Sequence, residues 1–192
     1  MKKLAPQIAL IFGLLLLSGG CNTVLDKVKR DQFEANPHKR SVGTRIDDQT
    51  IDTVVQHNIK KAHPDLAKAH IEVHSYNGVV LLTGEVPSEE LRDLARQTAA
   101  KVRNVRQVHN ETVVRGNSSM LSRTNDSVLH QKLKLKLARE EDLKGTDLDV
   151  VVRDSVVFLM GLVTEKQAEV AAHTSRLTSG VRKVVRVFEY IE

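Results

Sequence analysis

The chain has 192 residues, enough for one domain or two small ones, and aromatic residues make up 3 % of it, with no Trp. The formal net charge of +5 would suit a nucleic-acid partner, but residues 1–45 hold eight Lys and Arg against three Asp and Glu, whereas 46–115 and 124–192 are close to neutral. Because a duplex-binding domain places its positive charge on the folded module, this distribution argues against a nucleic-acid partner.

The first 20 residues have the order of a secretory signal: a basic start, the apolar stretch 8–17, and small residues before Cys21. The apolar stretch is too short to span a bilayer as a permanent helix. A lone cysteine in this place resembles a bacterial lipobox, with Ser18 where Leu is usual. The resemblance implies that residues 1–20 are a lipoprotein signal peptide and that Cys21 is acylated. The alternatives are an ordinary signal peptide with an incidental cysteine, or an uncleaved anchor.

Residues 21–45 show no apolar periodicity, and we interpret them as a lipidated N-terminus followed by a polar tether. The basic residues of the tether are either attracted to anionic headgroups, at about 1 kcal/mol each near the surface, or simply solvated. Asn22 follows the cysteine. By resemblance to lipoproteins of enteric-type bacteria, where Asp in this place causes retention at the inner membrane, Asn implies transport to the outer membrane.

Two apolar runs with a glycine near the end have the same construction, Val79–Val86 and Val156–Val163, 77 positions apart. A repeated construction at a fixed distance indicates duplicated units. We therefore expect two domains, at 46–115 and 124–192, joined by a linker at 116–123.

Each unit is expected to open with a helix whose N-cap is an aspartate, Asp48 in one unit and Asp126 in the other. Apolar residues follow at every fourth position, which predicts one core-facing stripe in each helix. The two stripes are Ile51, Val55 and Ile59, and Leu129, Leu133 and Leu137. Residues 132–137 also alternate as a strand would, but their alignment with the first unit favours a helix.

A hairpin, a second helix and a last strand complete each unit. The hairpin turns are predicted at Asn77-Gly78 and at Asp154-Ser155. Ser88 opens the second helix of one unit, and Thr164 with Gln167 has the spacing of a capping box in the other. The last strands are predicted at 105–114 and 181–191. The order αββαβ predicts an α+β fold, two tandem sandwiches, each a small three-stranded sheet with two helices on one face.

This unit resembles the BON domain, through Leu81–Val86 and Phe158–Val163 and through the later run Gly180–Val184, with Asn104 where that glycine falls in the first unit. Two such domains behind a lipobox resemble outer-membrane lipoproteins with two BON domains. The resemblance implies a non-enzymatic protein, lipid-anchored at the periplasmic face of the outer membrane. It also implies binding to anionic phospholipid, gathering at cell-division sites and support of envelope integrity.

The opening helix of the second unit predicts the lipid-binding surface. Projected at 100° per residue, Val128 and Leu135 fall nearly opposite the leucine stripe, beside cations. An outward apolar pair flanked by cations suits a headgroup boundary. The predicted phospholipid-binding residues are Val128, Leu135, Lys132, Lys136 and Arg139. The equivalent positions of the first unit hold Thr50 and His57, so this combination is expected in the second unit alone. The alternative is that the apolar pair packs against the first domain or a second copy.

The sequence predicts no catalytic, cofactor or metal site. The only cysteine serves the anchor, and neither a Gly-x-Ser-x-Gly turn nor a phosphate-binding glycine loop occurs. His57 with His63, and His70 with His74, are close in sequence but are interpreted as solvated surface residues. The main alternative function is a protein-interaction adaptor for a cell-wall hydrolase regulator or for the outer-membrane assembly machinery. Peptidoglycan binding is a third hypothesis.

Overall fold

The structure is a computed structural model that describes the backbone of residues 39–116 and 120–192 and the side chains of 39–116 and 124–192. The expected signal peptide 1–20, the expected acylation site Cys21 and the predicted tether up to residue 38 lie outside the described residues. Residues 37–192 form one compact unit that contains both repeats. Within the described ranges, no helix has both the length and the apolar character needed to cross a bilayer.

The first repeat begins with a long helix that starts inside the predicted tether. Ser41 caps this helix by accepting a hydrogen bond from the Thr44 N–H at 3.0 Å. The elements in chain order are α3 (Val42–Ala62), α4 (Pro64–Lys68), β1 (Ile71–Tyr76), β2 (Val79–Val86), α5 (Glu89–Ala100), β3 (Gln107–Asn110) and β4 (Val113–Val114).

The second repeat follows the same order, and its first helix begins inside the predicted linker 116–123. The capping box at Thr164 and Gln167 is present as predicted. The elements are α6 (Met120–Leu137), a 3-10 turn η1 (Glu141–Leu143), β5 (Leu148–Arg153), β6 (Val156–Val163), α7 (Glu165–Arg176) and β7 (Lys183–Tyr190).

In each sheet the second strand is central, antiparallel to the strand before it and parallel to the strand after the helix. The αββαβ order is therefore confirmed in both repeats. The predicted last strand of the first repeat is divided into β3 and β4, because Asn110 Oδ1 accepts hydrogen bonds from the backbone N–H and the hydroxyl of Thr112. β4 continues the pairing with the far end of β2.

The helices pack on one face of each sheet and form two cores. Both predicted stripes are buried, with exposed fractions of 6 % or less. They contact alternate residues of the strands, Val80 and Leu82 in the first repeat and Val157 and Leu159 in the second. Two-residue periodicity sends the intervening side chains to the opposite face of each sheet.

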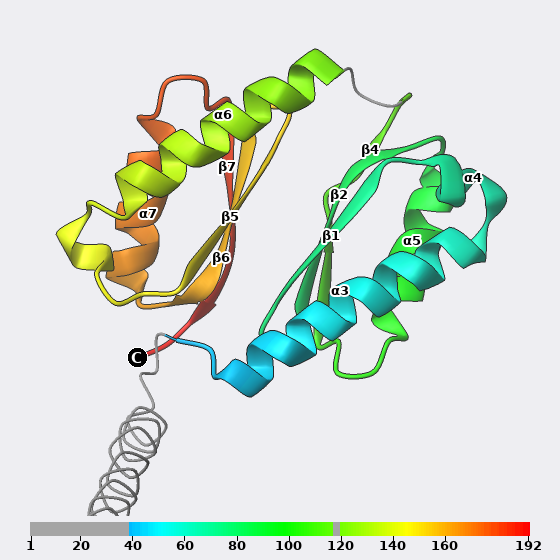
Figure 1. The fold of residues 1–192 in the computed structure, drawn as a ribbon, viewed down its shortest axis with the longest axis horizontal. Coiled ribbons are helices and arrows are strands. Elements are labelled where there is room, and N and C mark those ends of the chain that lie inside the picture. The colour runs from blue at the N-terminus through cyan, green and yellow to red at the C-terminus, as the bar shows by residue number, and fades with distance from the viewer. Residues whose placement is uncertain (1–38, 117–119) are drawn as a thin grey trace, which may run out of the picture. The chain divides into compact units, whose positions relative to one another are not determined.

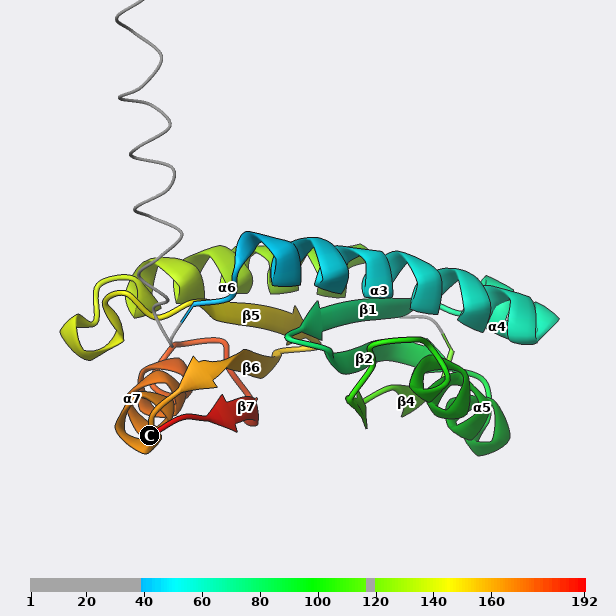
Figure 2. The ribbon, with the colours of Figure 1, turned by 90° about the horizontal axis from the view of Figure 1, so that it is seen from below.

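Those opposite faces pack against each other. Tyr76, Val79 and Leu81 of the first sheet form one buried cluster with four residues of the second, Val151, Phe158, Met160 and Val187. Figures 1 and 2 show the two sheets between outer helices, with α3 and α6 on the same side of the molecule. All eight residues of β2 are buried because one face of this strand meets helices and the other meets the second sheet.

The prediction that Asp48 and Asp126 are N-caps is wrong, because both lie inside their helices, at equivalent positions. The Asp48 carboxylate accepts the backbone N–H groups of Asn77 and Gly78, each at 2.9 Å. Asp126 accepts those of the second hairpin turn, Asp154 at 2.7 Å and Ser155 at 2.9 Å. Each aspartate therefore fastens a helix to a hairpin turn whose two central residues have positive φ.

Candidate functional site

The outward face of α6 carries the predicted apolar pair. Val128 is 65 % exposed and Leu135 is 61 % exposed, whereas Leu133 on the opposite side of the same helix is fully buried. The two side chains therefore pack neither in the core nor between the repeats, which excludes the alternative that they pack against the first domain.

The three predicted cations differ in their surroundings. Lys132 is exposed and its Nζ donates a hydrogen bond to the Ser179 carbonyl at 3.1 Å, which holds it beside the α7–β7 connection. Arg139 is exposed just beyond the end of the helix, whereas Lys136 is half-buried on its flank. Lys134, which the sequence reasoning omitted, is exposed on the other flank.

The charge of this helix is one-sided. Between residues 124 and 137 the sequence holds a single carboxylate, Asp126, and its oxygens are buried against the hairpin turn. Lys132 and Lys134 therefore give the solvent-facing side a positive charge that no carboxylate of the same segment offsets.

The first repeat differs at the equivalent positions, as expected, since Thr50 and His57 are exposed and polar. However, α3 begins at Val42, and its added turns expose Val42 at 73 % and Ile46 at 60 %. A second outward apolar pair therefore exists in the first repeat, at positions other than those equivalent to Val128 and Leu135. This pair is hard to find from the sequence, because Gly43 in the first turn is typical of a linker.

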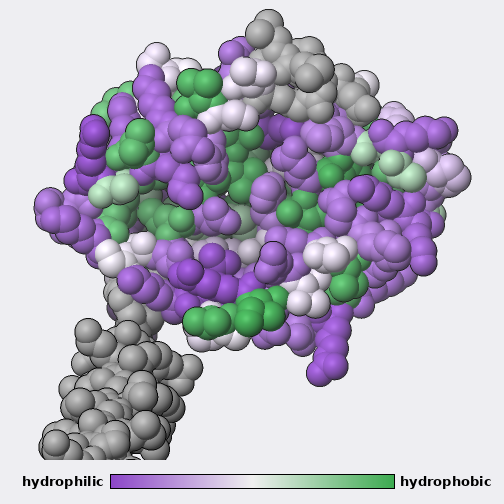
Figure 3. Space-filling view, in the orientation of Figure 1, coloured by the Kyte–Doolittle hydropathy of each residue, from purple (hydrophilic) through white to green (hydrophobic). Residues whose placement is uncertain are grey.

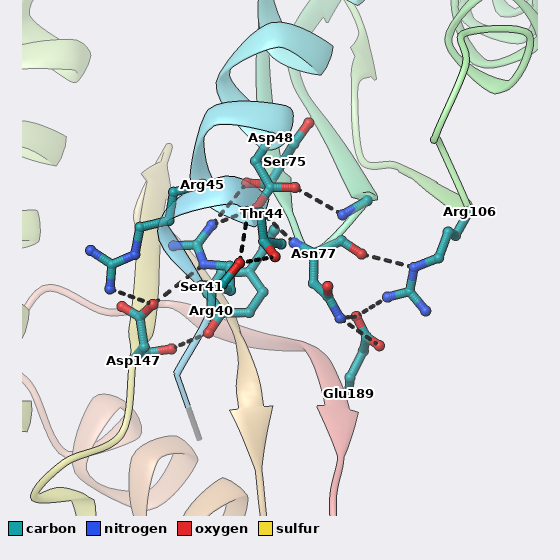
Figure 4. A network of polar contacts seen from close by, with 12 residues as sticks. Arg40, Ser41, Thr44, Arg45, Asp48, Ser75, Asn77, Arg106, Asp147 and Glu189 are labelled. Atoms are coloured by element: carbon teal, nitrogen blue, oxygen red, sulfur yellow. Dashed lines mark hydrogen bonds and ion pairs between the residues drawn. The ribbon is translucent and has the colours of Figure 1, made fainter. Parts of the chain in front are cut away.

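A polar network fastens the first described residues to both repeats (Figure 4). Arg40 donates to Asp48 at 2.9 Å and to Asp147 at 3.3 Å, and its guanidinium lies 3.6 Å from the centre of the Tyr76 ring. The Tyr76 hydroxyl donates to the Asp147 carbonyl at 2.6 Å, and burial is the largest cause that raises its pKa to about 12. Arg45 also pairs with Asp147, at 3.0 Å.

A second network lies in the seam, by which we mean the interface where the two sheets pack against each other. Arg153 of β5 donates to Glu72 at 3.0 Å and to Glu85 at 3.1 Å, and Arg115 also donates to Glu85 at 3.1 Å. The Glu85 side chain is fully buried and Arg153 is 8 % exposed. Buried charges are tolerated when each is paired, so this network favours one arrangement of the repeats.

His70, just before β1, and His74, within it, do not follow the prediction of solvated surface residues. His70 Nε2 lies 3.2 Å and His74 Nε2 3.8 Å from the Glu72 carboxylate, and all three side chains are partly buried. Strand geometry is the reason, since residues two apart share a face. The His74 ring is the largest cause that lowers the pKa of Glu72 to about 2, and Arg153 and His70 act in the same direction against burial. In the described part of the chain, no group of side chains fits a metal ion.

A groove of about 300 Å³ lies beside these histidines, lined by residues of β1, α6 and β5. It includes Glu72, His74, His130 and Arg153. Its carboxylates already accept hydrogen bonds from Arg153 or from backbone amides. The carboxylates of this groove are therefore engaged in contacts that join its walls.

Comparison with known proteins agrees with this architecture. The family model described as the BON domain matches residues 47–116 and again residues 125–192. The outer membrane lipoprotein DolP of Haemophilus influenzae is 34 % identical over 186 residues, which cover 97 % of this chain and 96 % of that protein. The 21 kDa hemolysin of Actinobacillus pleuropneumoniae is 32 % identical over 80 % of this chain and 79 % of its own length.

Among solved structures, CdsD, a structural protein of the type III secretion system of Chlamydia trachomatis, is similar at 10 % identity. The match covers 72 % of this chain and 91 % of that chain with a TM-score of 0.30. A score this low supports no further argument.

Proposed function

The chain belongs to the family of outer-membrane lipoproteins with two BON domains, and from this premise we propose that it binds anionic phospholipid membranes through the outward face of α6. The observation that carries the proposal is the exposure of Val128 and Leu135 on a helix whose solvent-facing charges are all positive. Such a face can place its apolar side chains below the headgroups while its lysines meet phosphates.

Magnitudes indicate what this surface can do. Full burial of a Val or Leu side chain contributes about 1.5–3 kcal/mol, and partial insertion contributes less. Each lysine near an anionic surface adds about 1 kcal/mol. The total corresponds to weak and reversible binding, so we propose that α6 orients the protein at a membrane where another element holds it.

We propose that acylated Cys21 is that element, at the periplasmic face of the outer membrane. Acyl chains give an anchor that one apolar pair cannot, because each buried CH₂ contributes about 0.8 kcal/mol. An anchored domain meets the bilayer at an effective concentration set by the tether, which makes a weak surface contact sufficient. Support of envelope integrity, gathering at cell-division sites and the absence of catalysis belong to the same proposal.

Vesicle co-sedimentation tests the proposal. The mature chain carrying Cys21→Ser, and therefore not acylated, is expected to sediment with vesicles of phosphatidylglycerol and phosphatidylcholine. Val128→Asp should weaken this binding about tenfold or more, because it places a carboxylate at an inserted position. Val113→Asp is the matched control, since Val113 is 49 % exposed on β4, away from α6.

Binding should also fall as salt rises, because the lysines of α6 act through screened charge. Equal sedimentation of Val128→Asp and the parent chain would refute this face. A protein that ignores vesicles but captures a purified envelope protein, such as a cell-wall hydrolase regulator or the outer-membrane assembly machinery, would favour the adaptor function instead.

A further inference from the structure

We infer that the first turns of α3 form a second membrane contact, through Val42 and Ile46, so that the protein meets the bilayer at two places. This inference rests on the proposed function of α6 and extends it to the other repeat. Val42 is 73 % exposed and Ile46 60 % exposed, which is comparable to Val128 and Leu135.

The orientation of the two helices supports the inference. Ile51 and Leu129 are equivalent buried residues of the two repeats, so angles around α3 and α6 can be compared directly. At 100° per residue, Ile46 points almost directly away from the core of its repeat, as Leu135 does in the other. Both apolar pairs therefore face outward from the same side of their domains.

The arrangement of the repeats brings these sides together. Figures 1 and 2 agree that α3 and α6 lie on one side of the molecule, with β4 toward the other. Figure 3 views the side that carries α3 and α6, and shows separate hydrophobic patches among hydrophilic side chains. One flat surface can therefore contact both helices.

The short distance along the chain from Cys21 to Val42 favours a lipid bilayer as the partner of this surface. Val42 lies 21 residues after Cys21, the proposed acylation site. Even a fully extended chain of this length reaches no farther than about 70 Å, so an anchor at Cys21 would keep this end of α3 within that distance of the lipid. A protein partner would need recruitment, whereas the bilayer is already present.

The two contacts differ in charge, which separates them experimentally. The charges near Val42 and Ile46 balance, because two cations are matched by two carboxylates: Lys39 and Arg45, and Asp47 and Asp147. Arg45 is paired with Asp147. This contact therefore acts through apolar insertion, whereas α6 adds lysines that no neighbouring carboxylate of the segment balances. Salt should weaken the contribution of α6 and leave that of α3 unchanged.

The test uses single tryptophan reporters, because the chain has no Trp. Val42→Trp, Val128→Trp and Val113→Trp are each introduced into the mature Cys21→Ser chain. Each variant is mixed with phosphatidylglycerol and phosphatidylcholine vesicles that carry brominated acyl chains, which quench inserted indoles. Val42→Trp and Val128→Trp should both be quenched, and Val113→Trp should not.

Quenching of Val128→Trp without quenching of Val42→Trp would overturn the second contact and leave the proposed function intact. If neither is quenched and the parent chain does not sediment, the proposed function fails, and the second contact with it. In a separate titration, Ile46→Asp should weaken vesicle binding about fivefold at both low and high salt. A loss that disappears at high salt would contradict an apolar contact.

Discussion

The two repeats share a fold but present different surfaces through their opening helices. In α6 the exposed apolar residues lie in the middle of the helix among lysines, whereas in α3 the two most exposed ones lie in the first turns, next to paired charges. The buried positions of these two helices match, Asp48 with Asp126 and each residue of one apolar stripe with one of the other. Duplication has therefore kept what folds the domain, and the outward positions have diverged.

The largest difference in stability between equivalent substitutions in the two repeats is expected at the glycines of the central strands. Gly84 has φ +112°, and a Cβ there would lie 1.9 Å from the His70 carbonyl oxygen. Gly84→Ala should therefore cost at least about 4 kcal/mol of unfolding free energy. At Gly161 a Cβ would meet the movable end of Leu148 at 2.8 Å, so Gly161→Ala should cost about 1–2 kcal/mol. Urea unfolding of both variants measures the difference, and equal losses would contradict it.

The next effect concerns the aspartates that fasten the hairpin turns. Asp126→Ala should cost about 2 kcal/mol, because it leaves two backbone N–H groups without acceptors. Asp48→Ala should cost about 3 kcal/mol, since Asp48 also pairs with Arg40 at 2.9 Å. Asp47→Ala, at an exposed neighbour, is the control and should remain within about 0.5 kcal/mol of the parent. If Asp126→Ala proved as harmless as the control, the fastening role would be wrong.

A gain of binding would sharpen the comparison of surfaces. Thr50→Val with His57→Leu gives α3 the apolar positions of α6, and both residues are exposed. The double variant should bind anionic vesicles about fivefold more tightly, a gain near 1 kcal/mol. It should also restore part of the binding lost in Val128→Asp. Co-sedimentation measures both effects, and an unchanged affinity would show that apolar exposure alone is insufficient.

The smallest effect is a dependence on pH in the seam. The pKa of Glu72 is lowered from 4.5 to about 2 in the folded protein. Its contribution to stability is therefore present above about pH 4.5 and is lost as pH falls toward about 2. Because Glu72 is 38 % exposed, solvent screening reduces the expected effect to about 1 kcal/mol. Thermal unfolding of Glu72→Gln should show a shallower acid slope than the parent chain, and parallel slopes would exclude Glu72.

Local patterns in the sequence predicted most of the fold. The stripes at Ile51, Val55 and Ile59 and the turn at Asn77-Gly78 depend on neighbours in the chain, and both are confirmed. Asn104 takes φ +66°, so it provides the backbone conformation that Gly180 has in the second repeat. This departure from the family pattern therefore leaves the turn unchanged.

The sequence-based predictions failed or were silent where a contact depends on residues that are distant in the chain or on where a helix begins. Asp48 could accept amides from the start of a helix or from a distant turn, and the sequence alone does not distinguish these roles. The pairing of Glu85 with Arg153 joins residues 68 positions apart, beyond the reach of any local pattern. The exposure of Val42 was missed because the true N-cap, Ser41, was assigned to the tether.

If the chain is anchored at Cys21, a pull on the anchor would enter the folded unit at Arg40. Its guanidinium donates to Asp48 of one repeat and to Asp147 of the other, so this end of the folded unit is bonded to both repeats. A force on the anchor would then be shared by both repeats and would not separate one repeat from the other.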